Sequence, residues 1–178
     1  MKKRAGFVVI VALTAIVFCF LGWRLWPHTF SALTSFDENS VASFWIQAVV
    51  RQYEDEQAYN DTYYCIDVEQ PQDNKLDEIL EILNTSNYQQ DYHNLLPGDI
   101  DTVHPDKNYD GNTVELCYAW GSEPDEYISV RFLSSSTIAV FIGGESGLHI
   151  YHPTNHETLY HLVEYLKVHG TVTTVSYP

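Results

Sequence analysis

The chain has 178 residues, of which 45% are hydrophobic and 14% aromatic, a composition that supports a folded core and excludes wholesale disorder. Its formal net charge is -15, although four of its nine basic residues, Lys2, Lys3, Arg4 and Arg24, precede the first acidic residue. The rest of the chain therefore holds five basic against 24 acidic residues. Such a surface repels phosphate groups, so we expect no nucleic acid partner and favour cations or a basic protein.

The first element in chain order is an uncharged stretch, residues 5–23, which as a helix is long enough to cross a bilayer core of about 30 Å. The basic residues before it favour a cytoplasmic N-terminus. The sequence therefore predicts residues 1–26 as a single-pass transmembrane anchor in the cell membrane, with the remainder extracytoplasmic. The alternative is a signal peptide whose cleavage releases a secreted protein. Residues 27–40 are expected to form a short stalk, and residues 41–178 a single domain.

Two helices and an extended run are expected in the first half of this domain. Residues 41–59 place Phe44, Trp45 and Ala48 at helical spacing, and residues 62–68 are rich in β-forming side chains. A second helix follows, because four apolar residues recur with the i, i+3, i+4, i+7 period of a helix face that packs against a core. These residues are Leu76, Ile79, Leu80 and Leu83.

The second half of the domain has the pattern of an antiparallel meander closed by a helix. Four β-type runs are separated by turn-length connections, which favours pairing between neighbours in sequence. A helix follows a capping box of Thr154 and Glu157 and ends at Gly170, and residues 171–178 either add an edge strand or stay loose. The four runs are residues 114–120, 127–133, 137–144 and 147–153, and the apolar stripe of the helix is Leu159, Leu162, Val163 and Leu166.

The fold class that these elements predict is α+β. After the transmembrane helix, we expect one domain with an antiparallel β-meander of about four to five strands and about two to three packing helices.

Cys65 and Cys117 are the two cysteines outside the N-terminal apolar stretch. In an oxidising compartment a disulfide between them would close a loop of about 50 residues and stabilise the fold by about 4 kcal/mol. Two separate buried thiols are the alternative, because cysteine also behaves as a small apolar residue.

Two groups of residues are candidates for metal binding. Asp106, Asn108, Asp110 and Glu115 place oxygen ligands in a pattern similar to calcium loops, with Gly111 at the bend. The match covers only half of an EF-hand loop, so a plain turn at the Asp-Gly pair is the alternative. Five histidines crowd into the C-terminal third and could bind zinc, although their spacing differs from the metalloprotease motif. They are His149, His152, His156, His161 and His169.

A basic start and one apolar span are followed by the segments KLDEILEILN, YISVRFL, TIAVFIGG and HETLYHLVEYLKVHG. This layout, over residues 1–170, is similar to that of small membrane-anchored extracytoplasmic domains of unknown function in Gram-positive bacteria. The resemblance rests on the order of the parts and implies no catalytic residue.

These observations favour a non-enzymatic, membrane-tethered extracytoplasmic domain that acts in binding or interaction. Its expected partners are the membrane, through residues 5–23, and a basic protein or another component of the cell envelope. Two alternatives stay open: a metal-dependent hydrolase that uses the histidine cluster, and a calcium-stabilised sensor module. The polar segments at residues 84–112 and 123–126 are expected to carry the binding function, because packing does not explain them.

Overall fold

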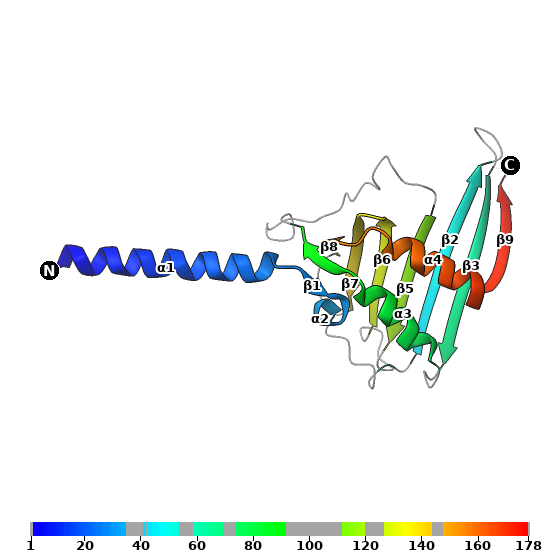
Figure 1. Ribbon diagram of the computed structural model, residues 1–178, viewed down its shortest axis with the longest axis horizontal. Helices are drawn as coiled ribbons and strands as arrows, with labels where there is room; N and C mark the ends of the chain where they lie inside the picture. The colour runs from blue at the N-terminus through cyan, green and yellow to red at the C-terminus, as the bar shows by residue number, and fades with distance from the viewer. Residues whose placement is uncertain are drawn as a thin grey trace.

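The structure is a computed structural model that describes residues 2–34, 41, 43–53, 59–69, 74–91, 112–119, 127–143 and 148–177. Its strands are β1 (His28–Thr29), β2 (Ser43–Tyr53), β3 (Tyr59–Glu69), β4 (Asn87–Gln90), β5 (Asn112–Ala119), β6 (Tyr127–Ser134), β7 (Thr137–Ile142), β8 (Leu148–Pro153) and β9 (Thr171–Tyr177). Its helices are α1 (Lys2–Leu25), α2 (Phe30–Thr34), α3 (Lys75–Asn84) and α4 (Thr158–His169). The strands form one antiparallel sheet in the order β1-β4-β8-β7-β6-β5-β2-β3-β9 (Figure 1).

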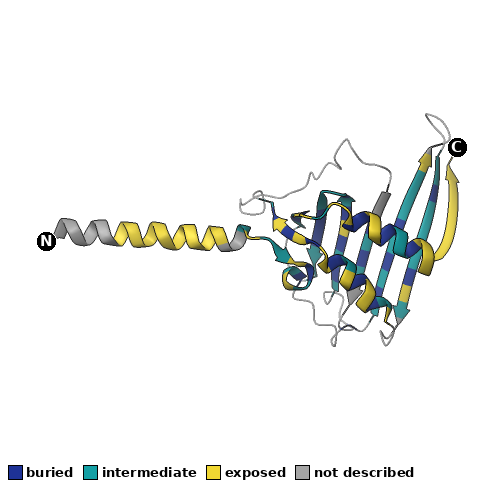
Figure 2. Cartoon of the chain, viewed as in Figure 1, coloured by how far each residue is buried: buried dark blue, intermediate teal, exposed yellow. Residues whose placement is uncertain are grey.

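One face of this sheet is covered by α3 and α4, and the core lies between the two layers (Figure 2). Strand side chains alternate between the two faces of a sheet, so each central strand contributes every second residue to the core. In β2, for example, Phe44, Ile46 and Ala48 are buried, whereas Trp45 and Gln47 between them are half-buried on the opposite face. We call that opposite face, which carries no described helix, the open face.

The apolar stripes predicted for α3 and α4 are confirmed, because all eight residues are buried in the core. The predicted capping box before α4 is wrong. Thr154 instead accepts a hydrogen bond from the backbone N–H of Asn87 at 3.1 Å, and the Asn155 side chain accepts from the N–H of Glu157 at 3.1 Å. Thr154 therefore connects the helix entry to β4.

The helix predicted over residues 41–59 is wrong, because Ser43–Tyr53 form the strand β2. The residues chosen for the helical stripe, Phe44 and Ala48, also fit a two-residue period when Ile46 is included, and all three are buried. β2 pairs with β3 on one side and with β5 on the other. This pairing places β2 inside the sheet, where the backbone N–H and C=O groups of an extended chain form hydrogen bonds with a strand on each side.

The α+β class predicted from the sequence is contradicted, because the described residues form mainly a nine-stranded antiparallel sheet with few helices. The meander itself is present, since β5, β6, β7 and β8 are consecutive neighbours. Of the strands on either side of it, β3 corresponds to the extended run predicted at residues 62–68 and β9 to the edge strand left open at residues 171–178, whereas β1, β2 and β4 were not predicted. β2, β3 and β9 extend the meander at one edge, and β4 and β1 extend it at the other.

Residues 28–34, expected within a stalk, are part of the folded unit. His28 and Thr29 pair with β4, and Phe30 is fully buried with its ring 6.0 Å from that of Tyr88. The Tyr88 hydroxyl donates to the carbonyl of Leu83 at 2.8 Å, and burial raises the pKa of this phenol. The start of the sheet is thereby joined to the end of α3.

Among the described residues, no helix combines the length and the apolar character that crossing a membrane requires. This finding contradicts the transmembrane anchor predicted at residues 5–23. The single-pass localisation and the signal-anchor assignment derived from that anchor are corrected with it.

Gly170 ends α4 at the point where the chain turns into β9. A Cβ atom there would lie 2.7 Å from the Leu166 carbonyl oxygen and 3.1 Å from the backbone nitrogen of Cys65. We therefore expect Gly170→Ala to lower the free energy of unfolding by about 1–3 kcal/mol, measured by chemical denaturation. Gly22→Ala is the control, because nothing lies within 4 Å of a Cβ at that position. Equal stability of the two variants would contradict the close packing at Gly170.

Candidate functional site

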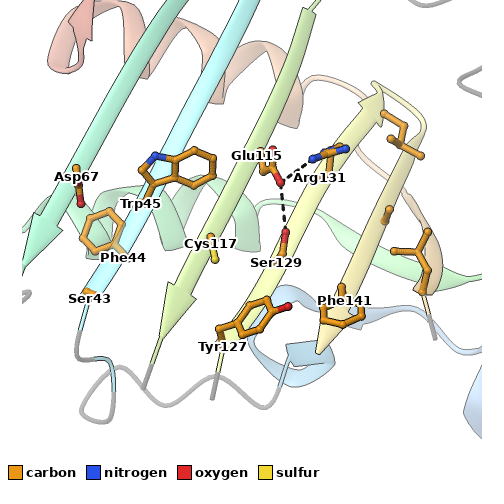
Figure 3. Close-up of a pocket in the computed structure, with 13 residues that line it drawn as sticks. Ser43, Phe44, Trp45, Asp67, Glu115, Cys117, Tyr127, Ser129, Arg131 and Phe141 are labelled. Carbon is orange, nitrogen blue, oxygen red and sulfur yellow. Dashed lines mark hydrogen bonds and ion pairs between the residues drawn. The ribbon is translucent and has the colours of Figure 1, made fainter. Parts of the chain in front are cut away.

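The open face carries a groove of about 850 Å³ (Figure 3). Six strands, β2, β3, β5, β6, β7 and β8, contribute its lining, and most of the lining residues are those that alternate with the core residues. The groove therefore follows from the two-residue period of the strands and from the position of both packing helices on the other face. Its polar and aromatic lining residues include Ser43, Trp45, Asp67, Glu115, Cys117, Tyr127, Ser129, Arg131 and Phe141.

The centre of the groove holds an ion pair across two strands. Glu115 of β5 and Arg131 of β6 are paired in register, and Arg131 Nη2 donates to Glu115 Oε1 at 2.8 Å. The Ser129 hydroxyl donates to the same oxygen at 3.5 Å. The Arg131 side chain is 54% exposed, so water screens the pair and its contribution to stability is small. Its main effect is to hold the Arg131 guanidinium at one position in the groove.

Aromatic side chains lie beside this ion pair and beyond Ser129 (Figure 3). Tyr127 of β6 and Phe141 of β7 have ring centroids 5.7 Å apart. On the other side, Trp45 of β2 is opposite Asp67 of β3 in the strand register. The groove thus has an aromatic pair at one end and an indole beside a carboxylate at the other.

The disulfide candidates Cys65 and Cys117 are free thiols in the structure. Cys65 is paired with Gln47 and Cys117 with Trp45, so β2 runs between their strands. Strands two positions apart are about 10 Å apart, beyond the Cα separation of about 7 Å that a disulfide allows. The structure therefore does not bring these thiols together.

Cys117 lines the groove as a protonated thiol. Burial raises its pKa, and the neighbouring carboxylate of Glu115 raises the pKa further. Because the thiolate is the nucleophilic form, this environment opposes covalent chemistry. The pKa of Cys65 is likewise raised, by burial and by Asp67.

The calcium candidates are only partly described. Asp106, Asn108 and Asp110 lie outside the described residues, and so do most of the segments expected to carry binding, 84–112 and 123–126. Glu115 lies in the groove, bound to Arg131. Among the described residues no group of three or more His, Cys, Asp or Glu side chains could hold a metal ion.

The five C-terminal histidines are dispersed over three elements. His149 and His152 belong to β8, and both ring nitrogens of His152 are engaged, one by the Ser136 carbonyl at 2.9 Å and one by Asp91 at 2.8 Å. His156 lies in the turn before α4 and is exposed. The remaining two are on α4, where His161 is 3.7 Å from Glu157 and His169 stacks on Tyr165. Among the described residues, these histidines form no group of three that could hold a zinc ion.

Comparison of the chain with protein-family models, with curated proteins and with solved structures gave no match. Inferences about function therefore depend on the geometry and charge of the groove.

The raised pKa of Cys117 can be tested by alkylation. Replacement of Glu115 in Glu115→Gln removes one of the two causes that raise this pKa. We expect the thiolate fraction at pH 8 to rise and the iodoacetamide rate at Cys117 to increase at least about twofold, followed by peptide mass spectrometry. Cys65 is the internal control, because its pKa is raised by burial and Asp67. An unchanged rate at Cys117, or an equal increase at Cys65, would contradict this account.

Proposed function

We propose that the protein is a non-enzymatic binding module whose groove on the open face takes a short, basic and amphipathic segment of a partner protein. The observation that carries this proposal is the order of side chains along the groove. A carboxylate beside an indole, a fixed ion pair and an aromatic pair follow one another across adjacent strands.

The end of the groove at Asp67 suits a cation. Asp67 is exposed and makes no ion pair with another described residue. Trp45 lies opposite it on β2, and an indole face attracts ammonium and guanidinium groups. A lysine or arginine side chain could therefore contact a carboxylate and an aromatic ring at once. The strong excess of acidic residues beyond Arg24 would steer such a ligand toward the surface.

The other end of the groove suits an apolar group. Tyr127 and Phe141 form an aromatic pair there, and Leu148, opposite Phe141 in the strand register, adds aliphatic surface. From β3 to β7 the sheet spans four strand spacings, or about 19 Å. An extended peptide of about six residues covers this distance. The dimensions thus favour a peptide with a basic residue at one end and aromatic or aliphatic residues toward the other.

The chemistry of the groove supports binding over catalysis. Cys117 is held in its thiol form, and the one described partner of the Ser129 hydroxyl is a carboxylate that is already bound to Arg131. A nucleophilic serine or cysteine needs a base that accepts its proton. No histidine is among the described residues that line the groove. These features disfavour the hydrolase alternative at this site.

The test uses two capped hexapeptides, KTFSLF and ETFSLF, titrated into the full chain by calorimetry. We expect KTFSLF to bind, ETFSLF to show no binding, and Asp67→Asn to weaken KTFSLF binding about fivefold to tenfold, because a charge-assisted hydrogen bond is lost. Binding should also weaken with salt.

The matched control is Asp77→Asn, which removes the same charge from an exposed position on α3, over the other face of the sheet. It should leave KTFSLF binding unchanged. Equal binding of both peptides, absence of binding, or equal losses in the two variants would overturn the proposal.

A further inference from the structure

β9 forms a long, exposed edge of the sheet. It pairs with β3 on one side, and the strand order among the described residues ends with it on the other. All seven of its residues are exposed. The opposite edge, β1, has only two residues. An edge strand presents a row of unpaired N–H and C=O groups, and an extended strand is the structure that pairs with such a row.

β9 lacks the features that usually block pairing at an edge. Its sequence, TVTTVSY, contains no charged residue and no proline, and its register with β3 continues without a bulge. Five of the seven residues are β-branched. Val172 and Val175 remain 57% and 38% exposed. A charged residue, a proline or a bulge would oppose strand addition, so this edge is open to it.

Side-chain contacts also hold β9 in place at both of its ends. At one end the Thr171 hydroxyl donates to the Cys65 carbonyl at 3.1 Å, and at the other the ring of Tyr177 stacks on Tyr59 at 4.7 Å. The Tyr59 ring is covered in turn by the Arg51 guanidinium, 4.0 Å from its centroid. A strand fixed at both ends loses little conformational entropy when it pairs, which favours association.

The charges around β9 select its partner. Asp61, the cross-strand neighbour of Val175, is bound by two hydrogen bonds of 2.8 Å from Arg51 and is thereby neutralised. Among the β3 residues that pair with β9, Tyr59 to Cys65, Asp61 is the one carboxylate, so a basic strand would find no unpaired carboxylate there. A second β9 brings no charge at all. We propose that two copies of the chain associate through β9, strand against strand in antiparallel orientation, so that their sheets form one continuous sheet.

The two-fold axis of this pair passes beside Thr174, the central residue of β9. Thr173 then lies opposite Val175 of the second copy, and Val172 opposite Ser176. These are β-branched and small side chains, which pack well across antiparallel strands. An antiparallel pair of identical strands is isologous, so the association closes at a dimer and leaves neither β9 edge open.

The experiment introduces charge at the axis, where Thr174 of each copy faces its counterpart. Thr174→Lys and Thr174→Glu each place like charges opposite one another and should abolish the pair, whereas an equimolar mixture of the two variants should restore it. The readout is hydrogen exchange of the β9 amides, compared at low and high protein concentration. Apolar side chains of α1 are also exposed, so sedimentation alone would not assign the contact to β9.

Wild type should show at least about tenfold slower exchange at high concentration in those β9 amides that do not already bond to β3. Val168→Lys, at a 75% exposed position on α4, adds the same charge as Thr174→Lys and should behave as wild type. Exchange that is independent of concentration in wild type, or protection that persists in both Thr174 variants, overturns the dimer.

Two further results separate this contact from the groove. Salt should strengthen the β9 pair, because it screens repulsion between two acidic copies, but should weaken KTFSLF binding. Thr174→Lys should bind KTFSLF as wild type does, so the proposal of a β9 dimer and the proposal of peptide binding in the groove can be overturned independently. Slower exchange of β9 on addition of KTFSLF to monomeric Thr174→Lys would assign the edge to a basic strand and overturn the second-copy proposal.

Discussion

Burial of one face of the sheet against α3 and α4 is the constraint on which the rest of the structure depends. The strand side chains that alternate toward the helices, such as Ile46, Leu116 and Val130, are almost completely buried. Because the period of a strand is two, the residues between them must face the other way. The open face, its groove and the exposed edge at β9 all result from covering a wide sheet on one side with two helices.

Local patterns in the sequence predicted the elements that contact their neighbours along the chain. The stripe of α3, from Leu76 to Leu83, has only a helical period, and β6 and β7 are joined by a two-residue turn. β2 was misassigned because its apolar residues fit both periods, and its partner β5 lies more than 60 residues later. Pairing across that distance has no local signal, so the width of the sheet could not be predicted.

The groove was harder to predict than the fold. Trp45, Asp67 and Arg131 come from three strands, and only the strand register places them on one face. The sequence offered compact motifs instead, such as the histidine-rich C-terminal third, and the structure disperses those side chains. The alternation of polar with apolar residues in YISVRFL was the available signal, since it marks Ser129 and Arg131 as facing away from the core.

The separation between β3 and β9 affects how the protein emerges during synthesis. Thr171 forms a hydrogen bond with Cys65, 106 positions earlier in the chain. The outer edge of β3 therefore cannot pair with β9 until β9, the last strand, has been synthesised. At ribosomal elongation rates this delay is about 5 to 20 seconds, far longer than a hairpin takes to form. During that interval the outer edge of β3, including Tyr63 and Tyr64, is available to chaperones and to neighbouring nascent chains on the same messenger RNA.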